Sequence, residues 1–141
     1  MKPHWPLLLA VAAGPFVWMM LYLWLQPVID FSLYLEQWRM LFMLILIYPI
    51  MEEWLFRGLL QSWLMESSLG RKSVARFTLA NAVTSIIFSA AHLFMHTLLW
   101  SMLVLFPSLI FGWMRDRYQS VRPAIALHIF YNSGYFLFFW P

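Results

Sequence analysis

The chain has 141 residues, of which 63% are hydrophobic and 11% charged, with a formal net charge of +3 and no cysteine. Soluble domains are roughly 45–50% apolar and about 25% charged, so the composition excludes an ordinary soluble protein. The absence of cysteine excludes disulfides and thiolate ligands and leaves Glu, His and Asn for chemistry. The basic residues lie beside apolar stretches, which argues against nucleic-acid binding and for orientation in a lipid bilayer.

The length allows about five membrane crossings joined by short loops, because about 20 apolar residues cross a bilayer once as a helix. We therefore predict an all-α integral membrane protein, a single bundle of about five transmembrane helices. The expected spans are residues 5–25, 38–64, 77–96, 98–114 and 123–140. Residues 1–37 then make up the first transmembrane helix and a loop, and residues 38–141 the functional core.

Polar segments separate these spans. Residues 26–37 are expected to form a loop, and residues 66–76, ESSLGRKSVAR, a basic surface loop in which Ser73 caps the next helix. A second basic loop is expected at residues 115–122, RDRYQSVR. With five crossings, the positive-inside rule places both basic loops and the N-terminus in the cytoplasm and the C-terminus outside. The expected location is a cell membrane, of the bacterial inner-membrane type.

A small set of ionisable side chains remains inside the predicted spans: Glu52, Glu53, Arg57, His92, His96 and His128. Each charge costs about 2.5–3.5 kcal/mol at the centre of a membrane helix, so such residues usually face the bundle interior and carry function. These side chains are therefore the first candidates for a site.

Glu52, Glu53 and Arg57 belong to the segment MEEWLFRGLL, residues 51–60. Glu53 and Arg57 are four residues apart with the acid on the N-terminal side, the favourable order for an ion pair within a helix. Glu52 points about 100° away from Glu53 and suits a general base that takes a proton from water. The alternative is that both acids lie at the cytoplasmic end of a shorter helix and are solvated.

The third span carries a polar stripe at helical spacing: Asn81, Ser85, Ser89, His92 and His96. A stripe on an otherwise apolar helix indicates an interior face, and a cavity there is expected. His92 and His96 also have the spacing of a zinc-binding pair, which a further Glu or His would complete. Alternatively, His92 is a hydrogen-bonded packing residue and His96, near the predicted turn, is solvated.

The fifth span contains HIFYN, which places His128 and Asn132 on one helical face. Both side chains donate hydrogen bonds and suit an oxyanion hole, where an oxygen atom gains negative charge. The alternative is hydrogen bonding between helices, which is common for His and Asn in membranes.

Together, EEWLFRG, FSAAH and HIFYN resemble the motifs EExxxR, FxxxH and HxxxN of the CAAX protease and bacteriocin-processing family of intramembrane proteases, also called the CPBP or Abi family. The motifs stand in the family's order and cover residues 50–135. The resemblance implies that residues 38–141 are the protease core of a compact family member, an intramembrane endopeptidase.

The resemblance also implies a role for each motif residue. Glu52 and His92 activate the water, and His128 and Asn132 stabilise the oxyanion. Glu53, Arg57 and Phe88 support the site. No cofactor is expected, because Asn is a poor zinc ligand and a good oxyanion donor. The alternative is a divalent metal such as zinc, held by Glu52, His92 and His128.

The expected substrate is a membrane-embedded or lipidated protein, either a prenylated protein or the C-terminal sorting tail of an exported protein. The first competing function is a non-catalytic immunity or assembly partner in the membrane, which a missing motif residue would have favoured. The second is a proton-coupled carrier, which the absence of an internal sequence repeat disfavours.

Overall fold

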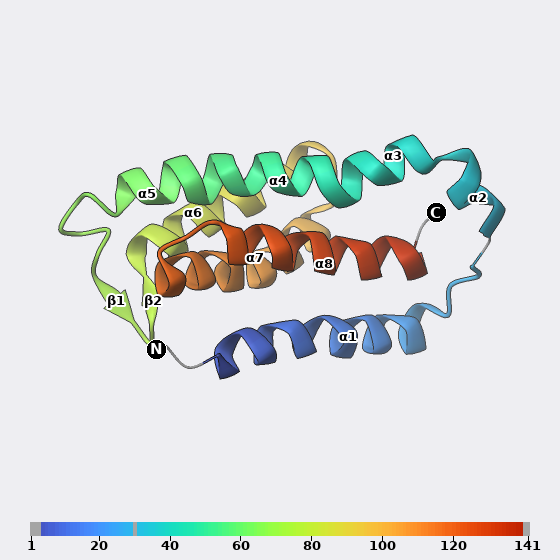
Figure 1. The fold of residues 1–141 in the computed structure, drawn as a ribbon, viewed down its shortest axis with the longest axis horizontal. Helices are drawn as coiled ribbons and strands as arrows, with labels where there is room; N and C mark the ends of the chain where they lie inside the picture. The colour runs from blue at the N-terminus through green and yellow to red at the C-terminus, as the bar shows by residue number, and fades with distance from the viewer. Residues whose placement is uncertain (1–3, 30, 140–141) are drawn as a thin grey trace. The chain divides into compact units, whose positions relative to one another are not determined.

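The computed structural model describes residues 4–29 and 31–139, which are mostly helical (Figure 1). They fall into two compact units, the first formed by Met1–Ile50 with Leu127–Pro141 and the second by Met51–Ala126. Among the described residues, α1 (Trp5–Leu25) and α7 (Leu98–Tyr118) are long and apolar enough to cross a bilayer. The predicted helical class is confirmed, and the count of five crossings remains a prediction.

The predicted second span is one helical run that changes register twice. It consists of α3 (Trp38–Phe42), the π-helix η1 (Met43–Ile47), α4 (Tyr48–Glu53), the π-helix η2 (Trp54–Leu60) and α5 (Gln61–Leu64). In the π segments a backbone N–H bonds five residues back, as Tyr48 N–H does to the Met43 carbonyl and Gln61 N–H to that of Phe56. Such segments often occur at functional sites, and both acids lie between them.

The first and last predicted spans appear as α1 and α8 (Arg122–Phe139). The predicted end of the last span at Trp140 lies outside the described residues. In the first unit the Tyr131 hydroxyl donates to the Ala10 carbonyl at 2.5 Å, and the Trp18 indole lies against Gly134, where a methyl group would overlap it. The two helices run side by side in the same direction (Figure 1).

Two expectations about the loops were wrong. Residues Phe31–Glu36 form the helix α2 inside the predicted loop. Strands β1 (Ser73–Val74) and β2 (Phe77–Thr78) form a small antiparallel hairpin that pairs Ser73 with Thr78. Because the hairpin takes Ser73 into a strand, Thr78 caps α6 instead, and its hydroxyl accepts a hydrogen bond from the backbone N–H of Asn81 at 3.0 Å.

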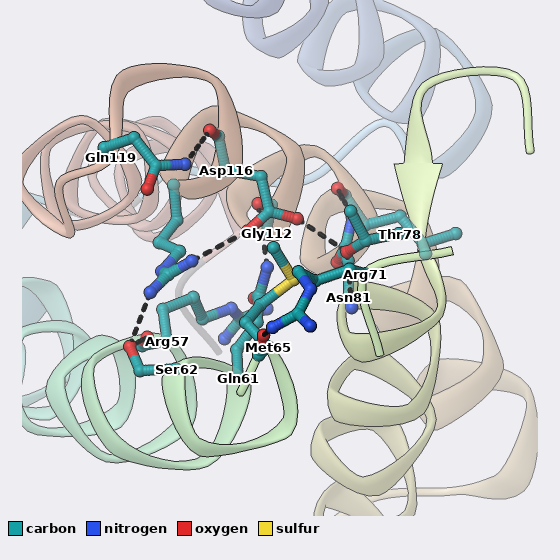
Figure 2. A network of polar contacts seen from close by, with 12 residues as sticks. Arg57, Gln61, Ser62, Met65, Arg71, Thr78, Asn81, Gly112, Asp116 and Gln119 are labelled. Carbon is teal, nitrogen blue, oxygen red and sulfur yellow. Dashed lines mark hydrogen bonds and ion pairs between the residues drawn. The ribbon is translucent and has the colours of Figure 1, made fainter. Parts of the chain in front are cut away.

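The third and fourth spans also end at other residues than expected. The third is shorter, with α6 (Leu79–Ala91) followed by a 3-10 turn, η3 (His92–Phe94). The fourth is longer, because α7 continues to Tyr118 through the first half of the predicted basic loop. Its polar end has partners in the second unit: Arg115 donates to Ser62 Oγ at 2.6 Å, and Asp116 accepts from Arg115 at 3.0 Å and from Thr78 at 2.6 Å (Figure 2).

Candidate active site

The centre of the second unit is the buried guanidinium of Arg57, which lies in η2. Arg57 and Glu53 are both fully buried, and Arg57 Nη1 donates to Glu53 Oε1 at 2.9 Å, so the predicted ion pair is confirmed. Arg57 Nη2 donates to the carbonyl of Ser108 at 3.0 Å and to its hydroxyl at 2.6 Å. A buried cation is tolerated only with such bonds, because leaving its donors unsatisfied costs free energy.

Aromatic rings complete the surroundings of Arg57. Its guanidinium carbon is 4.5 Å from the ring centroid of Phe88 and 5.6 Å from that of Phe111, both within the range of cation–π attraction. Phe56 packs edge-on against Phe88 at 5.0 Å. Phe88, which begins the second motif, therefore lies directly on Arg57, which ends the first.

His92 follows Phe88 by one turn and contacts it twice. The ring centroids are 4.7 Å apart, and His92 Nδ1 is 2.8 Å from the Phe88 carbonyl oxygen. Because a carbonyl only accepts, Nδ1 carries the hydrogen and donates it. In the neutral ring, Nε2 is then the nitrogen that can take up a proton. The contact with Phe88 thus leaves Nε2 as the acceptor nitrogen of the neutral His92 ring.

Glu52 and Glu53 have different surroundings although they are adjacent. Glu53 is fully buried, whereas Glu52 is half-buried at the end of α4 and is attracted electrostatically to Arg57. Both acids lie inside the continuous helical run from Trp38 to Leu64. The alternative that both are solvated at the end of a shorter helix is therefore wrong.

Two side chains of the polar stripe on α6, those of Asn81 and Ser89, donate hydrogen bonds to backbone carbonyls of α7. Asn81 Nδ2 donates to the Leu109 carbonyl at 3.0 Å, the Ser85 hydroxyl donates to Asn81 Oδ1 at 3.1 Å, and the Ser89 hydroxyl donates to the Ser101 carbonyl at 2.5 Å. These side chains are therefore hydrogen-bonded, and the cavity expected along the stripe stays a prediction.

The His92 and His96 rings stack with centroids 5.9 Å apart, and His96 is exposed. A metal ion bound by both would need one nitrogen of each ring at about 2.0–2.1 Å from a common point. Among residues 4–29 and 31–139, no three His, Asp or Glu side chains gather as a metal site requires. The metal alternative of Glu52, His92 and His128 takes its residues from both units, so it stays a prediction, and the reaction proposed for the chain uses no metal.

The sequence prediction missed the part that α7 plays. Gln61 Nε2 donates to the Gly112 carbonyl at 3.1 Å, and a methyl group on Gly112 would overlap Asn81 (Figure 2). The sequence did contain a signal: Ser101, Ser108 and Gly112 share one helical face, and small residues at such spacing let membrane helices approach closely. All three are buried.

The third motif lies in the part of α8 that belongs to the first unit. His128 is 6% exposed, and Asn132 Nδ2 donates to the carbonyl of Leu44 in η1 at 2.9 Å. An amide nitrogen carries two hydrogens, so this bond leaves Asn132 a second N–H with which to donate. The bond is also of the helix-to-helix kind that the alternative interpretation expected.

Comparison with known proteins gave one finding. The model of the family described as type II CAAX prenyl endopeptidase Rce1-like matches residues 34–134. That range includes all three motifs. No curated protein and no solved structure matches the chain.

Proposed function

The chain belongs to the Rce1-like family of type II CAAX prenyl endopeptidases, and from that premise we propose that it hydrolyses a peptide bond at or near the end of a membrane-embedded or lipid-anchored segment. The family supports a peptidase that is integral to the membrane. The observation that carries the proposal is the chain of contacts from the buried Glu53 through Arg57 and Phe88 to the half-buried His92, which joins the first two motifs.

In this proposal Glu52 is the general base. It takes a proton from a water molecule, and the resulting hydroxide attacks the carbonyl carbon of the scissile bond. His92 Nε2 accepts a hydrogen bond from the same water and orients it, because Nδ1 is committed to the Phe88 carbonyl. Glu53 and Arg57 keep the helix that carries Glu52 in a fixed register.

His128 and Asn132 are proposed as the donors to the tetrahedral oxyanion. When the intermediate collapses, the C–N bond breaks and the proton held by Glu52 passes to the leaving amine nitrogen. The products are a carboxylic acid and an amine: one hydrogen of the water ends on the amine nitrogen, and the oxygen and the other hydrogen end on the new carboxyl group, which then ionises. This assignment rests on the resemblance of HIFYN to the family's third motif and on the donor chemistry of the two side chains.

A substrate within the membrane follows from the physics of the bilayer. The connection from α5 to α6 contains only a small two-stranded hairpin, and the other connections between the described helices are shorter, so they offer little surface for recognising a folded partner in water. A scissile bond inside a helix is protected by its own hydrogen bonds. We therefore expect cleavage where Gly, Pro or polar residues let a transmembrane or lipid-anchored segment unwind. Prenylated proteins and C-terminal sorting tails are the two candidate substrate classes.

The test is to express the gene with its genomic neighbours and to search by mass spectrometry for a membrane protein that is shortened by the parent and not by Glu52→Gln. Placing a Leu and Ala run across the cleavage site should slow the reaction, whereas changes in a distant soluble domain should not. Efficient cleavage of a water-soluble protein without membrane segment or lipid would contradict the proposal.

A further inference from the structure

The carbonyl of Leu44 lacks both donors that its own helix would normally offer. In an α-helix it would accept from the N–H of Tyr48, but that N–H bonds to the Met43 carbonyl in the π register of η1. In the π register it would accept from residue 49, which is Pro49 and has no N–H. Pro49 thus leaves a backbone acceptor open in the middle of an apolar helix.

Asn132 occupies that acceptor. Its Nδ2 is 2.9 Å from the Leu44 carbonyl oxygen. A backbone carbonyl that goes without a donor inside a membrane costs several kcal/mol, so the side-chain amide stands where the missing backbone N–H would have been. Leu44, Pro49 and Asn132 all belong to the first unit.

The bond also fixes which way the amide of Asn132 points. With Nδ2 on the Leu44 carbonyl, a flip would bring Oδ1 against another oxygen and is disfavoured. The second N–H of Asn132 is then held in one direction before any substrate arrives. Stabilisation of an oxyanion depends on donors that are oriented in advance.

We infer that Pro49 is a positioning residue for Asn132: by leaving the Leu44 carbonyl without a backbone donor, it makes that carbonyl the anchor of the Asn132 amide. The catalytic part of this inference rests on the proposed function, in which Asn132 donates to the oxyanion. The anchoring itself is a property of the structure and can be measured in the absence of any substrate.

The measurement uses the full chain, labelled with 15N-asparagine, in detergent micelles. Asn81 and Asn132 are the only asparagines in the sequence, so the spectrum contains two side-chain amide pairs, and loss of one pair in Asn132→Gln assigns them. In the parent protein, one proton of the Asn132 pair should exchange with water more slowly than the other. Two equally fast protons would overturn the inference without any change at Pro49.

Pro49→Ala supplies the missing N–H and should release the amide. Exchange of the anchored Asn132 proton should accelerate about tenfold, the order expected when one hydrogen bond is lost, while the Asn81 pair stays in place. Pro107→Ala, at the proline inside α7, is the matched control and should leave the Asn132 pair unchanged. If Pro49→Ala leaves the exchange rates of the two Asn132 side-chain amide protons unchanged, the anchoring is refuted.

The kinetic readout separates positioning from folding. Pro49→Ala should lower kcat about tenfold with KM unchanged within about twofold, because it disturbs a donor used in the transition state. An unchanged kcat in a variant whose Asn132 amide is released would refute the catalytic part of the inference. If the parent cleaves nothing, the proposed function fails, while the exchange measurements still decide the anchoring.

Discussion

The adjacent acids Glu52 and Glu53 should respond differently to the same substitution. Glu52→Gln should abolish cleavage and leave the protein inserted and abundant. Glu53→Gln should lower the stability of the fold as well as the activity. The two variants remove the same charge at neighbouring positions, so each serves as the matched control for the other.

The size of the Glu53 effect follows from the contacts of Arg57. Both side chains are fully buried and joined at 2.9 Å, and removing one partner of a buried ion pair costs about 3–5 kcal/mol because a buried charge is left uncompensated. Arg57 retains its two bonds to Ser108, which places the expected loss near the lower limit. That loss is a large share of a typical unfolding free energy of about 5–15 kcal/mol. Glu52 is half-buried, and we expect its substitution to change stability by about 1 kcal/mol or less.

Unfolding in mixed micelles with increasing SDS, followed by the fluorescence of the nine tryptophans, measures stability, and cleavage of the identified substrate measures activity. Loss of the general base should lower kcat by at least about 100-fold. The double variant Glu53→Gln/Arg57→Met should lose about 2 kcal/mol less than the sum of the single variants, because both buried charges are then gone. The reasoning would be refuted if Glu53→Gln had the same unfolding midpoint in SDS as the parent. It would also be refuted if Glu52→Gln cleaved the substrate at the parent's rate.

Three further variants or treatments test other parts of the structure. Ser108→Ala should lower the unfolding free energy by about 1.5–3 kcal/mol, because it removes a hydrogen bond to a charged group; an unchanged SDS midpoint would contradict the contact with Arg57. A reporter fused after Pro141 should lie outside the cytoplasm and one inserted at Lys72 inside it, and the reverse would overturn the orientation. Activity should survive thorough chelation, and His96→Ala should be tolerated far better than His92→Ala; activity lost on chelation and restored by zinc would support the metal alternative.

Hydropathy and spacing predicted the features that depend on a single helix. The run from Trp38 to Leu64 and the span from Trp5 to Leu25 have the expected limits, because an apolar stretch long enough to cross a bilayer must form a helix. The Glu53–Arg57 pair was equally predictable, since it depends only on the spacing along one helix.

Features that depend on contacts between distant segments were not predictable in the same way. The fourth span was expected to end before Arg115, but Arg115 and Asp116 bond to Ser62 and Thr78, and these tertiary contacts keep polar residues in the helix. Likewise, no local pattern shows that the Leu44 carbonyl would be open, because that depends on a π register. Tertiary packing overrides local preference at these positions.

The directions of neighbouring helices bear on the orientation of the chain. In the second unit, Arg57 contacts Ser108 and Gln61 contacts Gly112, so the second and fourth predicted spans run in the same direction. Asn81 and Ser89 of α6 contact positions 109 and 101 of α7 in reverse order, so the third and fourth predicted spans run in opposite directions.

In the first unit, α1 and α8 are parallel (Figure 1). Five crossings that alternate in direction require each of these relations. An odd number of crossings leaves the two termini on opposite sides of the membrane, whereas the side on which each terminus lies is predicted by the positive-inside rule alone.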